Sequence, residues 1–383
     1  MSDHTIAHLH DHAVARREAG LRRTLTARAA DDHRLDLAGN DYLGLARHPG
    51  VITGSVAATQ LWGAGSTGSR LVTGTTELHC DLEREFAKFT GADSTLVFSS
   101  GYLANIGAIT SLTDSDTLLV SEAQNHASIV DACRLSRARV AITPHRDLAA
   151  VQRLLAQRTE PRAVVVTDAV FSVDGDLADL ASLATICRDS NALLIVDEAH
   201  SLGVIGVDGS GAVAAAGLGG RPDIVVTATL SKAFGSQGGL VLAHADVTAH
   251  IIDSARAFIF DTGLAPASVG AAQAALRLLQ AEPGLAEQCR TNATALAHIA
   301  RESGWEATTP DAAVVSLAVG DPAVAVAAAR ACAEAGVLVG CFRPPSVPDG
   351  VSRLRLTSRA NLTASDLELV ASVLTSVRED LRP

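Results

Sequence analysis

Residues 163–200 read AVVVTDAVFSVDGDLADLASLATICRDSNALLIVDEAH, and this stretch decides the fold. It contains two apolar runs, AVVVT at 163–167 and ALLIV at 192–196, of the kind found in strands buried on both faces. Between them, residues 179–188 have the pattern of a helix. Alternating strands and helices of this kind predict a mostly parallel sheet covered by helices.

The same alternation extends to both sides of this stretch. Further helical segments are expected at 102–112, 128–135 and 147–156. The expected strands are 95–98, 117–120, 139–142, 163–167, 192–196, 223–227 and 239–243. The sequence therefore predicts an α/β fold whose large domain contains a mostly parallel, seven-stranded sheet.

The ends of the chain have a different pattern. A helical stretch rich in Ala and Leu begins at about residue 265 and continues past Pro283. A smaller C-terminal α+β domain is then expected from strands at 314–319, 337–340 and 352–357 and helices at 322–335 and 364–378. The first 25 residues are expected to form an amphipathic helix that packs on the rest. The predicted divisions are 1–45 (N-terminal helix and arm), 46–265 (large domain) and 266–383 (connecting helix and small domain).

Composition limits the class of protein. The chain has 383 residues, of which 48% are hydrophobic and 19% charged, and this suits a globular protein of two domains. A formal net charge of −11 disfavours nucleic acid or an anionic membrane as a partner. No apolar run approaches the roughly 18 residues of a membrane span, and the first residues lack the order of a signal peptide. The six scattered cysteines read as reduced thiols, so a cytoplasmic protein is expected.

Lysine is almost absent from the chain. The 31 basic residues include only two lysines, Lys88 and Lys232. Where arginine serves for every other positive charge, a remaining lysine is a candidate for chemistry that guanidinium cannot perform, such as forming an imine. Lys88 lies in an amphipathic helical pattern and suits an exposed position. Lys232 directly follows a predicted strand, so it is the candidate catalytic lysine, although a surface loop remains the alternative.

Acidic and polar residues follow other predicted strands. Asp197 ends the strand that leads into VDEAH, and ligands bind at the carboxyl ends of such strands. A helix-capping role for Asp197 stays open. A helicase is excluded because neither lysine follows a glycine, as a phosphate-binding loop requires, and the common hydrolase motif GxSxG is absent. At two other strand-to-helix junctions, Gly101 with Tyr102 suits an anion site, and His126 suits either a stacking contact with a flat ring or a position near a helix N-terminus without such a role.

Two further patterns have weaker interpretations. Gly63–Gly68 matches the dinucleotide-binding motif GxGxxG, but no convincing strand precedes it, so a close-packed loop is the better interpretation and a non-catalytic NAD-binding module is the distant alternative. The histidines of the N-terminal tail could bind a metal, but a solvated terminus explains them better, and no metal site is predicted. They are His4, His8, His10 and His12.

Taken together, the segments resemble the pyridoxal-phosphate-dependent α-oxoamine synthases, which have the aspartate-aminotransferase-like fold, fold type I. The resemblance extends over nearly the whole chain. It depends on NDYLGL at 40–45, GAGSTGSRLVTG at 63–74, SGY at 100–102, NHAS at 125–128, FSVDGD at 171–176, VDEAH at 196–200, TLSK at 229–232 and RLRLT at 353–357. It departs at Asp168, where many relatives have Glu, and at Ser231, where many have Gly.

The resemblance implies an acyltransferase that uses pyridoxal 5′-phosphate (PLP). Lys232 would hold the cofactor through an imine and then remove the α-proton of the amino acid. Asp197 would pair with the pyridinium nitrogen, and His126 would stack on the ring and contact the substrate. The other implied cofactor contacts are Gly101, Tyr102 and Thr229 near the phosphate, and Ser172 and His200 near the phenolic oxygen.

The resemblance also implies the substrates. Arg355 would bind the amino-acid carboxylate through two hydrogen bonds. Arg22, Arg343 and Ser346 match positions near the acyl substrate, and RPPSVP at 343–348 resembles the members that act in biotin biosynthesis. Those members condense L-alanine with pimeloyl-CoA or a pimeloyl carrier-protein thioester, losing carbon dioxide. The alternative is another member, such as a glycine C-acetyltransferase or a 5-aminolevulinate synthase. A homodimer with shared active sites is implied in either case.

Overall fold

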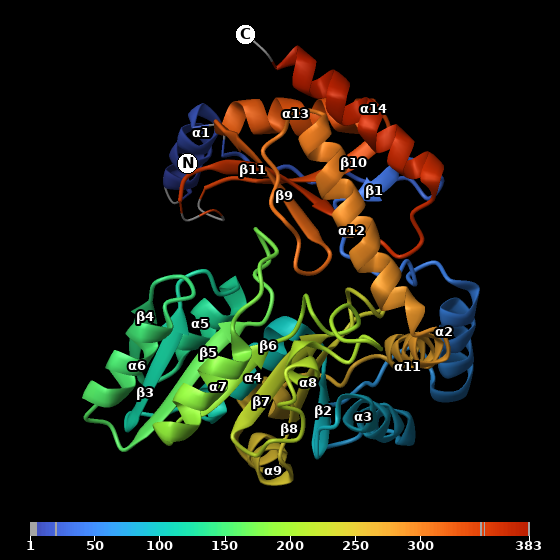
Figure 1. Ribbon diagram of the computed structural model, residues 1–383. Helices are drawn as coiled ribbons and strands as arrows, with labels where there is room; N and C mark the ends of the chain where they lie inside the picture. Colours follow the sequence, from blue (N-terminus) through green and yellow to red (C-terminus); the bar gives the residue numbers. More distant parts are fainter. Residues whose placement is uncertain (1–5, 20, 345–346, 348, 382–383) are drawn as a thin grey trace.

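A computed structural model describes residues 6–19, 21–344, 347 and 349–381 of the chain (Figure 1). Within these residues the chain forms one seven-stranded sheet and one four-stranded sheet, the large and the small sheet. In Figure 1 the small sheet and its helices lie above the large sheet, and helix α12 (Gly284–Glu302) extends from one to the other.

The large sheet has the strand order β2-β8-β7-β6-β5-β3-β4. Only β8 is antiparallel to its neighbours within this sheet, as far as the described residues go. The strands are β2 (Ser94–Phe98), β3 (Thr117–Glu122), β4 (Arg139–Thr143), β5 (Arg162–Asp168), β6 (Leu193–Asp197), β7 (Ile224–Thr229) and β8 (Gly239–Ala243). All seven predicted strands are therefore confirmed, together with the mostly parallel arrangement.

Helices cover both faces of the large sheet, which explains the unbroken apolar runs. Along β5, Val165 packs in the core under α6 and α7, whereas Val164 and Val166 pack in the core under α4 and α5. The helices around this sheet are α2 (Pro49–Trp62), α3 (Glu77–Thr90), α4 (Gly101–Ser111), α5 (Ala127–Leu135), α6 (Leu148–Gln157), α7 (Leu180–Asp189), α8 (Ala212–Ala215), α9 (Ala245–Ser254), α10 (Arg256–Ile259) and α11 (Pro266–Ala281).

The small sheet has the order β1-β10-β11-β9 and its own apolar core. Its elements are β1 (Leu35–Leu37), β9 (Val314–Gly320), α13 (Pro322–Glu334), β10 (Val337–Phe342), β11 (Ser352–Thr357) and α14 (Ala364–Asp380). The expected strands and helices of this region are present. Strand β1 was not predicted: it pairs in parallel with β10, with Leu35 opposite Val337, so the N-terminal arm joins a sheet built mainly from the far end of the chain.

The prediction for the N-terminus is only half right. Helix α1 (Ala7–Glu18) forms, but none of its described residues is buried, so the predicted packing on the rest is wrong. Charged and histidine side chains lie on all sides of this helix, and no apolar stripe is wide enough to bury. The long helical stretch also divides, because α11 ends at Ala281 and α12 begins after Pro283.

The fold shows the setting of the Gly-rich segment and the state of the cysteines. The GAGSTG segment follows helix α2 and not a strand, so it lacks the setting of a dinucleotide-binding motif and is a loop. Each of the six cysteines, all within the described ranges, is a free thiol. In the part of the chain that the structure describes, no helix is both long and apolar enough to cross a membrane.

Candidate active site

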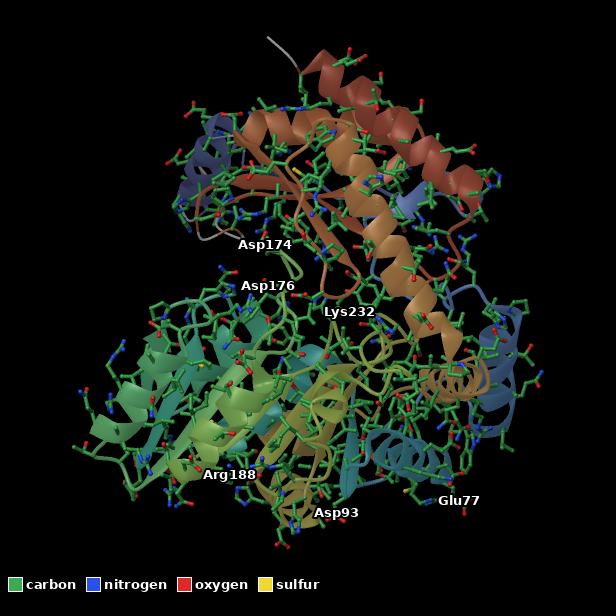
Figure 2. The ribbon with its side chains drawn as sticks, in the orientation of Figure 1. Glu77, Asp93, Asp174, Asp176, Arg188 and Lys232 are labelled. Carbon is green, nitrogen blue, oxygen red and sulfur yellow. The ribbon has the colours of Figure 1, made fainter. Side chains whose placement is uncertain are left out.

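Acidic residues end two adjacent strands in the middle of the large sheet. Asp168 ends β5, Asp197 ends β6, and the two residues are register partners. Lys232 follows β7, the next strand, after a short turn. In Figure 2 Lys232 lies at the edge of the large sheet that faces the small sheet. The carboxyl ends of parallel strands therefore bring together the residues that the sequence singled out.

Lys232 belongs to a chain of three side chains. Its Nζ lies 2.9 Å from Nε2 of His200, and Nδ1 of His200 lies 2.5 Å from the hydroxyl oxygen of Tyr42. Burial lowers the pKa of Lys232 to about 8, although the nearby carboxylates of Asp197 and Asp168 oppose this shift. Burial also lowers the pKa of His200 well below its usual range, and the positive charge of Lys232 adds to this effect. The site therefore favours a neutral imidazole next to an amine that loses its proton easily.

Asp197 is buried and held by two donors. Its Oδ1 accepts a hydrogen bond of 2.8 Å from the backbone N–H of Ala199, and its Oδ2 accepts one of 2.6 Å from Nδ2 of Asn105. The hydroxyl of Thr227 donates to Oδ1 of Asn105, which fixes the orientation of that amide. The carboxylate of Asp197 is thus fixed in position, as a charge that faces a ring nitrogen has to be.

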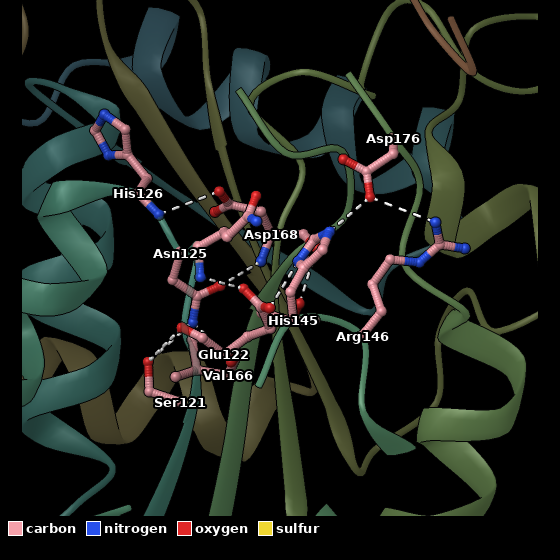
Figure 3. Close-up of polar contacts among 11 residues, drawn as sticks. Ser121, Glu122, Asn125, His126, His145, Arg146, Val166, Asp168 and Asp176 are labelled. Carbon is pink, nitrogen blue, oxygen red and sulfur yellow. Dashed lines mark hydrogen bonds and ion pairs between the residues drawn. The ribbon is translucent and has the colours of Figure 1, made fainter. Parts of the chain in front are cut away.

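Asp168 is the second buried carboxyl group, with 2% of its surface exposed. Its Oδ2 accepts a hydrogen bond of 3.1 Å from the backbone N–H of His126, and its own N–H donates to Oδ1 of Asn125 (Figure 3). Burial raises the pKa of Asp168 well above its usual range, and the charge of Asp197 raises it further. Its Oδ1 has no hydrogen-bond partner among the described residues.

His126 stands at the start of α5, and its ring points away from Asp168 in Figure 3. Nδ1 of His126 lies 2.7 Å from the hydroxyl of Ser128. Burial lowers the pKa of His126, and the charge of Lys232 lowers it further, whereas Asp197 has the opposite effect. A neutral ring in this position leaves its face available for stacking.

The start of α4 lies beside the end of β7. A Cβ placed on Gly101 would lie 3.0 Å from Cβ of Thr229, so the absence of a side chain at this position permits the close approach. The backbone N–H groups at the start of a helix form an anion site. Tyr102 is 44% exposed, and its hydroxyl donates a hydrogen bond of 2.6 Å to Asp131 on α5. The structure thus brings Gly101 and Thr229 together, whereas the hydroxyl of Tyr102 faces the surface.

Arg355 reaches the site from the small sheet. Its Nη1 donates to the carbonyl oxygen of Ser172 at 2.9 Å, and its Nη2 donates to Oδ1 of Asn40 at 3.1 Å. The guanidinium lies over the ring of Phe342, 4.4 Å from the ring centroid. Although Arg355 is only 5% exposed, its Nε finds no partner within the described ranges. A buried guanidinium with a free donor suits a carboxylate ligand.

The three acyl-site candidates are less well defined. Arg22 lies in exposed coil after α1, and Arg343 is half-buried just after β10. Ser346 lies outside the described residues. The backbone carbonyl of Ser172 contacts Arg355, whereas the structure shows no hydrogen bond from the Ser172 hydroxyl to any described residue. No sequence pattern assigns a role to Tyr42, Asn105 or Asn40, although Tyr42 and Asn40 belong to the NDYLGL motif.

The residues present fit PLP. An aldehyde cofactor needs a buried amine of lowered pKa, and Lys232 provides one. Its pyridine nitrogen needs a fixed carboxylate, and its phosphate needs backbone N–H groups at a helix start, and these are Asp197 and the first residues of α4. No group of three or more histidines, cysteines or acids that could hold a metal ion is found among the residues that the structure describes.

Comparisons with known proteins show the family to which the chain belongs. Residues 32–374 match the family model for aminotransferase class I and II. A curated 8-amino-7-oxononanoate synthase from Mycolicibacterium gilvum is 60% identical over 97% of this chain and 97% of its own length. A solved structure of SPT with a PLP internal aldimine covers 98% of each chain, with a TM-score of 0.91 and 28% identity. An 8-amino-7-oxononanoate synthase from Francisella tularensis covers 91% of this chain and 99% of its own, with a TM-score of 0.78 and 26% identity.

These matches extend over the large sheet, the small sheet and the residues between them. The fold is therefore that of the PLP-dependent transferases of fold type I, the cofactor is PLP, and the protein is an acyl-transferring enzyme. The chain belongs to the aminotransferase class I and II family and, within it, to the 8-amino-7-oxononanoate synthases.

Proposed function

We propose that this protein condenses L-alanine with a pimeloyl thioester and releases carbon dioxide, the free thiol and 8-amino-7-oxononanoate. The observation that carries the proposal is the partly buried contact between Lys232 and His200 beside Asp197, in a chain that has only two lysines. The relatives that are about 60% identical and named for this product support it.

Lys232 has two tasks in this proposal. PLP, when bound, supplies an electron sink for the negative charge that develops on the carbon next to the amino group. Lys232 holds the cofactor covalently and, once released from it, accepts the α-proton of alanine at its Nζ. A pKa of about 8 suits both tasks, because a useful fraction of the amine is neutral near physiological pH.

Asp197 and His200 control charge around the cofactor. Asp197, whose carboxylate Asn105 and Ala199 hold in place, would pair with the ring nitrogen of PLP and keep it protonated. His200 lies between Tyr42 and Lys232 and would position the phenolic oxygen of the cofactor. His126 would stack on the cofactor ring and exclude water from it.

Arg355 binds the carboxylate of alanine. Ser172 and Asn40 accept hydrogen bonds from Nη1 and Nη2 of Arg355. These two contacts fix the orientation of the guanidinium and therefore of its remaining Nε. Because the guanidinium is buried, its ion pair with a carboxylate is stronger than one in water. Fixing this carboxylate orients the α-carbon above Lys232.

The acyl chain ends in a carboxylate that needs a positive or hydrogen-bonding partner away from the cofactor. Arg22, Arg343 and Ser346 are the proposed contacts, with the thioester carried either by coenzyme A or by a carrier protein. The proposed place of action is the cytoplasm, which the free thiols of the six cysteines support, since disulfides form in oxidising compartments.

The active form in this proposal is a homodimer with shared active sites. Leu61, Val72 and Phe260 are strongly exposed apolar residues, and Leu71 is half exposed. The bridge between Ser69 and Thr262 brings Leu71 and Val72, in the loop after α2, near Phe260, which follows α10. An exposed apolar surface of this kind is typical of a protein interface.

Sedimentation tests the dimer. Val72→Asp places a charge in this surface and is expected to convert the protein to a monomer. Ile142→Asp, at an exposed apolar position on β4 at the opposite edge of the large sheet, is the matched control and should stay dimeric. A wild-type protein that sediments as a monomer would contradict the proposal.

A panel of substrates tests the reaction. Purified holoenzyme is assayed with pimeloyl-CoA, acetyl-CoA and succinyl-CoA, each with L-alanine and with glycine. The highest kcat/KM is expected for pimeloyl-CoA with alanine, and mass spectrometry should identify 8-amino-7-oxononanoate. A preference for acetyl-CoA or succinyl-CoA with glycine would instead assign the chain to another α-oxoamine synthase activity.

A further inference from the structure

The turn at 171–176, which follows β5, accepts hydrogen bonds from two arginine side chains of the small sheet. The carbonyl oxygen of Ser172 accepts a hydrogen bond from Nη1 of Arg355, and the carboxylate of Asp174 accepts one of 2.8 Å from Nε of Arg353. Both arginines lie on β11. The position of this turn therefore determines where Arg355 is held.

Backbone hydrogen bonds close the turn on itself. The backbone N–H of Phe171 donates to the carbonyl oxygen of Asp176, and the N–H of Gly175 donates to the carbonyl oxygen of Phe171. Gly175 has a φ of +77°, and a Cβ on it would lie 2.5 Å from the carbonyl oxygen of Val314 on β9. Glycine at this position thus allows the turn to rest directly on the small sheet.

A histidine that the proposed reaction does not use holds the other end of the turn. Nε2 of His145 lies 2.9 Å from Oδ2 of Asp176, and its Nδ1 lies 2.8 Å from Oε1 of Glu122 at the end of β3 (Figure 3). The ring also stands edge-on against Phe171, with ring centroids 4.6 Å apart. His145 therefore joins the turn to the large sheet through both of its nitrogens.

The charges around His145 define what each protonation state can do. The charged groups that face the ring are Glu122 from β3, Asp176 from the turn and Arg146, whose Nη1 lies 3.4 Å from the same Oδ2 of Asp176. An imidazolium donates to both carboxylates, whereas a neutral imidazole has one N–H and donates to only one of them. The link between the large sheet and the turn is complete only when His145 is protonated.

We propose that His145 is a positioning residue for the amino-acid substrate: by bridging Glu122 and Asp176 it fixes the 171–176 turn, so that the carbonyl of Ser172 holds Arg355 ready for the substrate carboxylate. The inference rests on the proposed function in one respect, namely that Arg355 binds the carboxylate of alanine. It adds a residue on the opposite side of the turn from Arg355.

Two variants and one control test the inference. His145→Ala removes both donors, and His145→Gln keeps one donor at similar size. Arg146→Ala is the matched control, because Arg146 contacts the same carboxylate of Asp176 from an exposed position without bridging to Glu122. The dissociation constant of L-alanine is measured from the change in the visible absorbance of the holoenzyme, and KM for pimeloyl-CoA is measured separately.

The expected result is a split between the two substrates. His145→Ala weakens alanine binding roughly fivefold to twentyfold, as expected for losing charge-assisted hydrogen bonds that act through another residue. KM for pimeloyl-CoA changes by less than about twofold, His145→Gln recovers part of the alanine affinity, and Arg146→Ala stays close to wild type.

Equal losses for both substrates, or no loss for alanine, would overturn the inference. Thermal unfolding of each holoenzyme shows whether a variant still folds, and His145→Gln carries the test if His145→Ala does not. A wild-type protein that binds alanine but makes no product with pimeloyl-CoA would refute the proposed function alone, because the positioning test uses alanine binding without turnover. A wild-type protein that binds no alanine would refute both.

Discussion

The hydroxyl of Tyr42 lies 2.5 Å from Nδ1 of His200, although 158 residues separate them in the sequence. Burial raises the pKa of Tyr42 above its usual range, so the phenol keeps its proton. We assign that proton to the contact with His200, because the alternative acceptor, Oδ1 of Asn40, is farther away at 3.3 Å. Nε2 of His200 then carries the other hydrogen and donates to Nζ of Lys232, which favours the neutral amine.

Tyr42→Phe tests this chain of contacts. The variant keeps the ring but leaves a buried nitrogen of His200 without its partner, which costs about 1–3 kcal/mol. We expect kcat/KM for alanine to fall roughly fivefold to a hundredfold, with the cofactor still bound. Steady-state kinetics and the absorbance of the bound cofactor measure the two effects. A change of less than about twofold in kcat/KM would show that Tyr42 only fills space.

The lowered pKa of Lys232 predicts how the cofactor-free protein regains activity. Only the neutral amine reacts with an aldehyde, so the rate of recombination with PLP should rise with pH as Lys232 loses its proton. With a pKa of about 8, the rate should reach half of its maximum near that pH. Stopped-flow absorbance measures the rate. A rate that still rises above about pH 10, as for an ordinary lysine, would contradict the lowered pKa.

Asp197→Asn separates charge from hydrogen bonding. An amide in place of the carboxylate can still accept one of the two hydrogen bonds, from Asn105 or from Ala199, but it no longer keeps a ring nitrogen protonated. The cofactor should stay bound while kcat falls by roughly 10²- to 10³-fold, the usual cost of removing a fixed charge-stabilising group. Cofactor content and kcat are measured on the same preparation. Near-normal turnover would limit Asp197 to a structural role.

Substitution of Arg355 should affect mainly KM for alanine, whereas substitution of Arg22 or Arg343 should affect mainly KM for pimeloyl-CoA. Arg355→Lys loses the planar, paired hydrogen bonds to a carboxylate and should raise KM for alanine more than KM for pimeloyl-CoA. Arg343→Ala and Arg22→Ala should do the reverse, each by roughly tenfold to a hundredfold, if each makes a charge-assisted contact with the acyl carboxylate. Initial rates over a grid of both substrates give the KM values. Equal effects on both would remove Arg22 and Arg343 from the acyl site.

The sequence was sufficient for the large sheet because its strands are buried on both faces and read as apolar runs, as in β5 and β6. It could not predict β1, whose three residues form a strand only because Val337, some 300 residues later in the chain, supplies the partner. The predicted packing of α1 is wrong, because the helix carries charged and histidine side chains on all sides and has no apolar stripe wide enough to bury.

The active site likewise contains residues that a local sequence pattern predicts and residues that depend on distant partners. Lys232 and Asp197 were found because each follows a strand of the predicted sheet, and the scarcity of lysine singled out Lys232. Tyr42, Asn105 and His145 were not found, because each acts through a partner that is distant in the sequence. Such contacts have no local pattern, although Asn105 lies one turn after Gly101 on the same helix.

The central claim is that Lys232 is the residue that holds PLP. Borohydride reduction of the holoenzyme, followed by peptide mass spectrometry, shows which of the two lysines carries the cofactor. We expect the phosphopyridoxyl group on the Lys232 peptide of wild type and of Lys88→Ala, with full turnover in the latter, and no labelled lysine and no turnover in Lys232→Ala. A label on Lys88, or normal turnover in Lys232→Ala, would contradict the account.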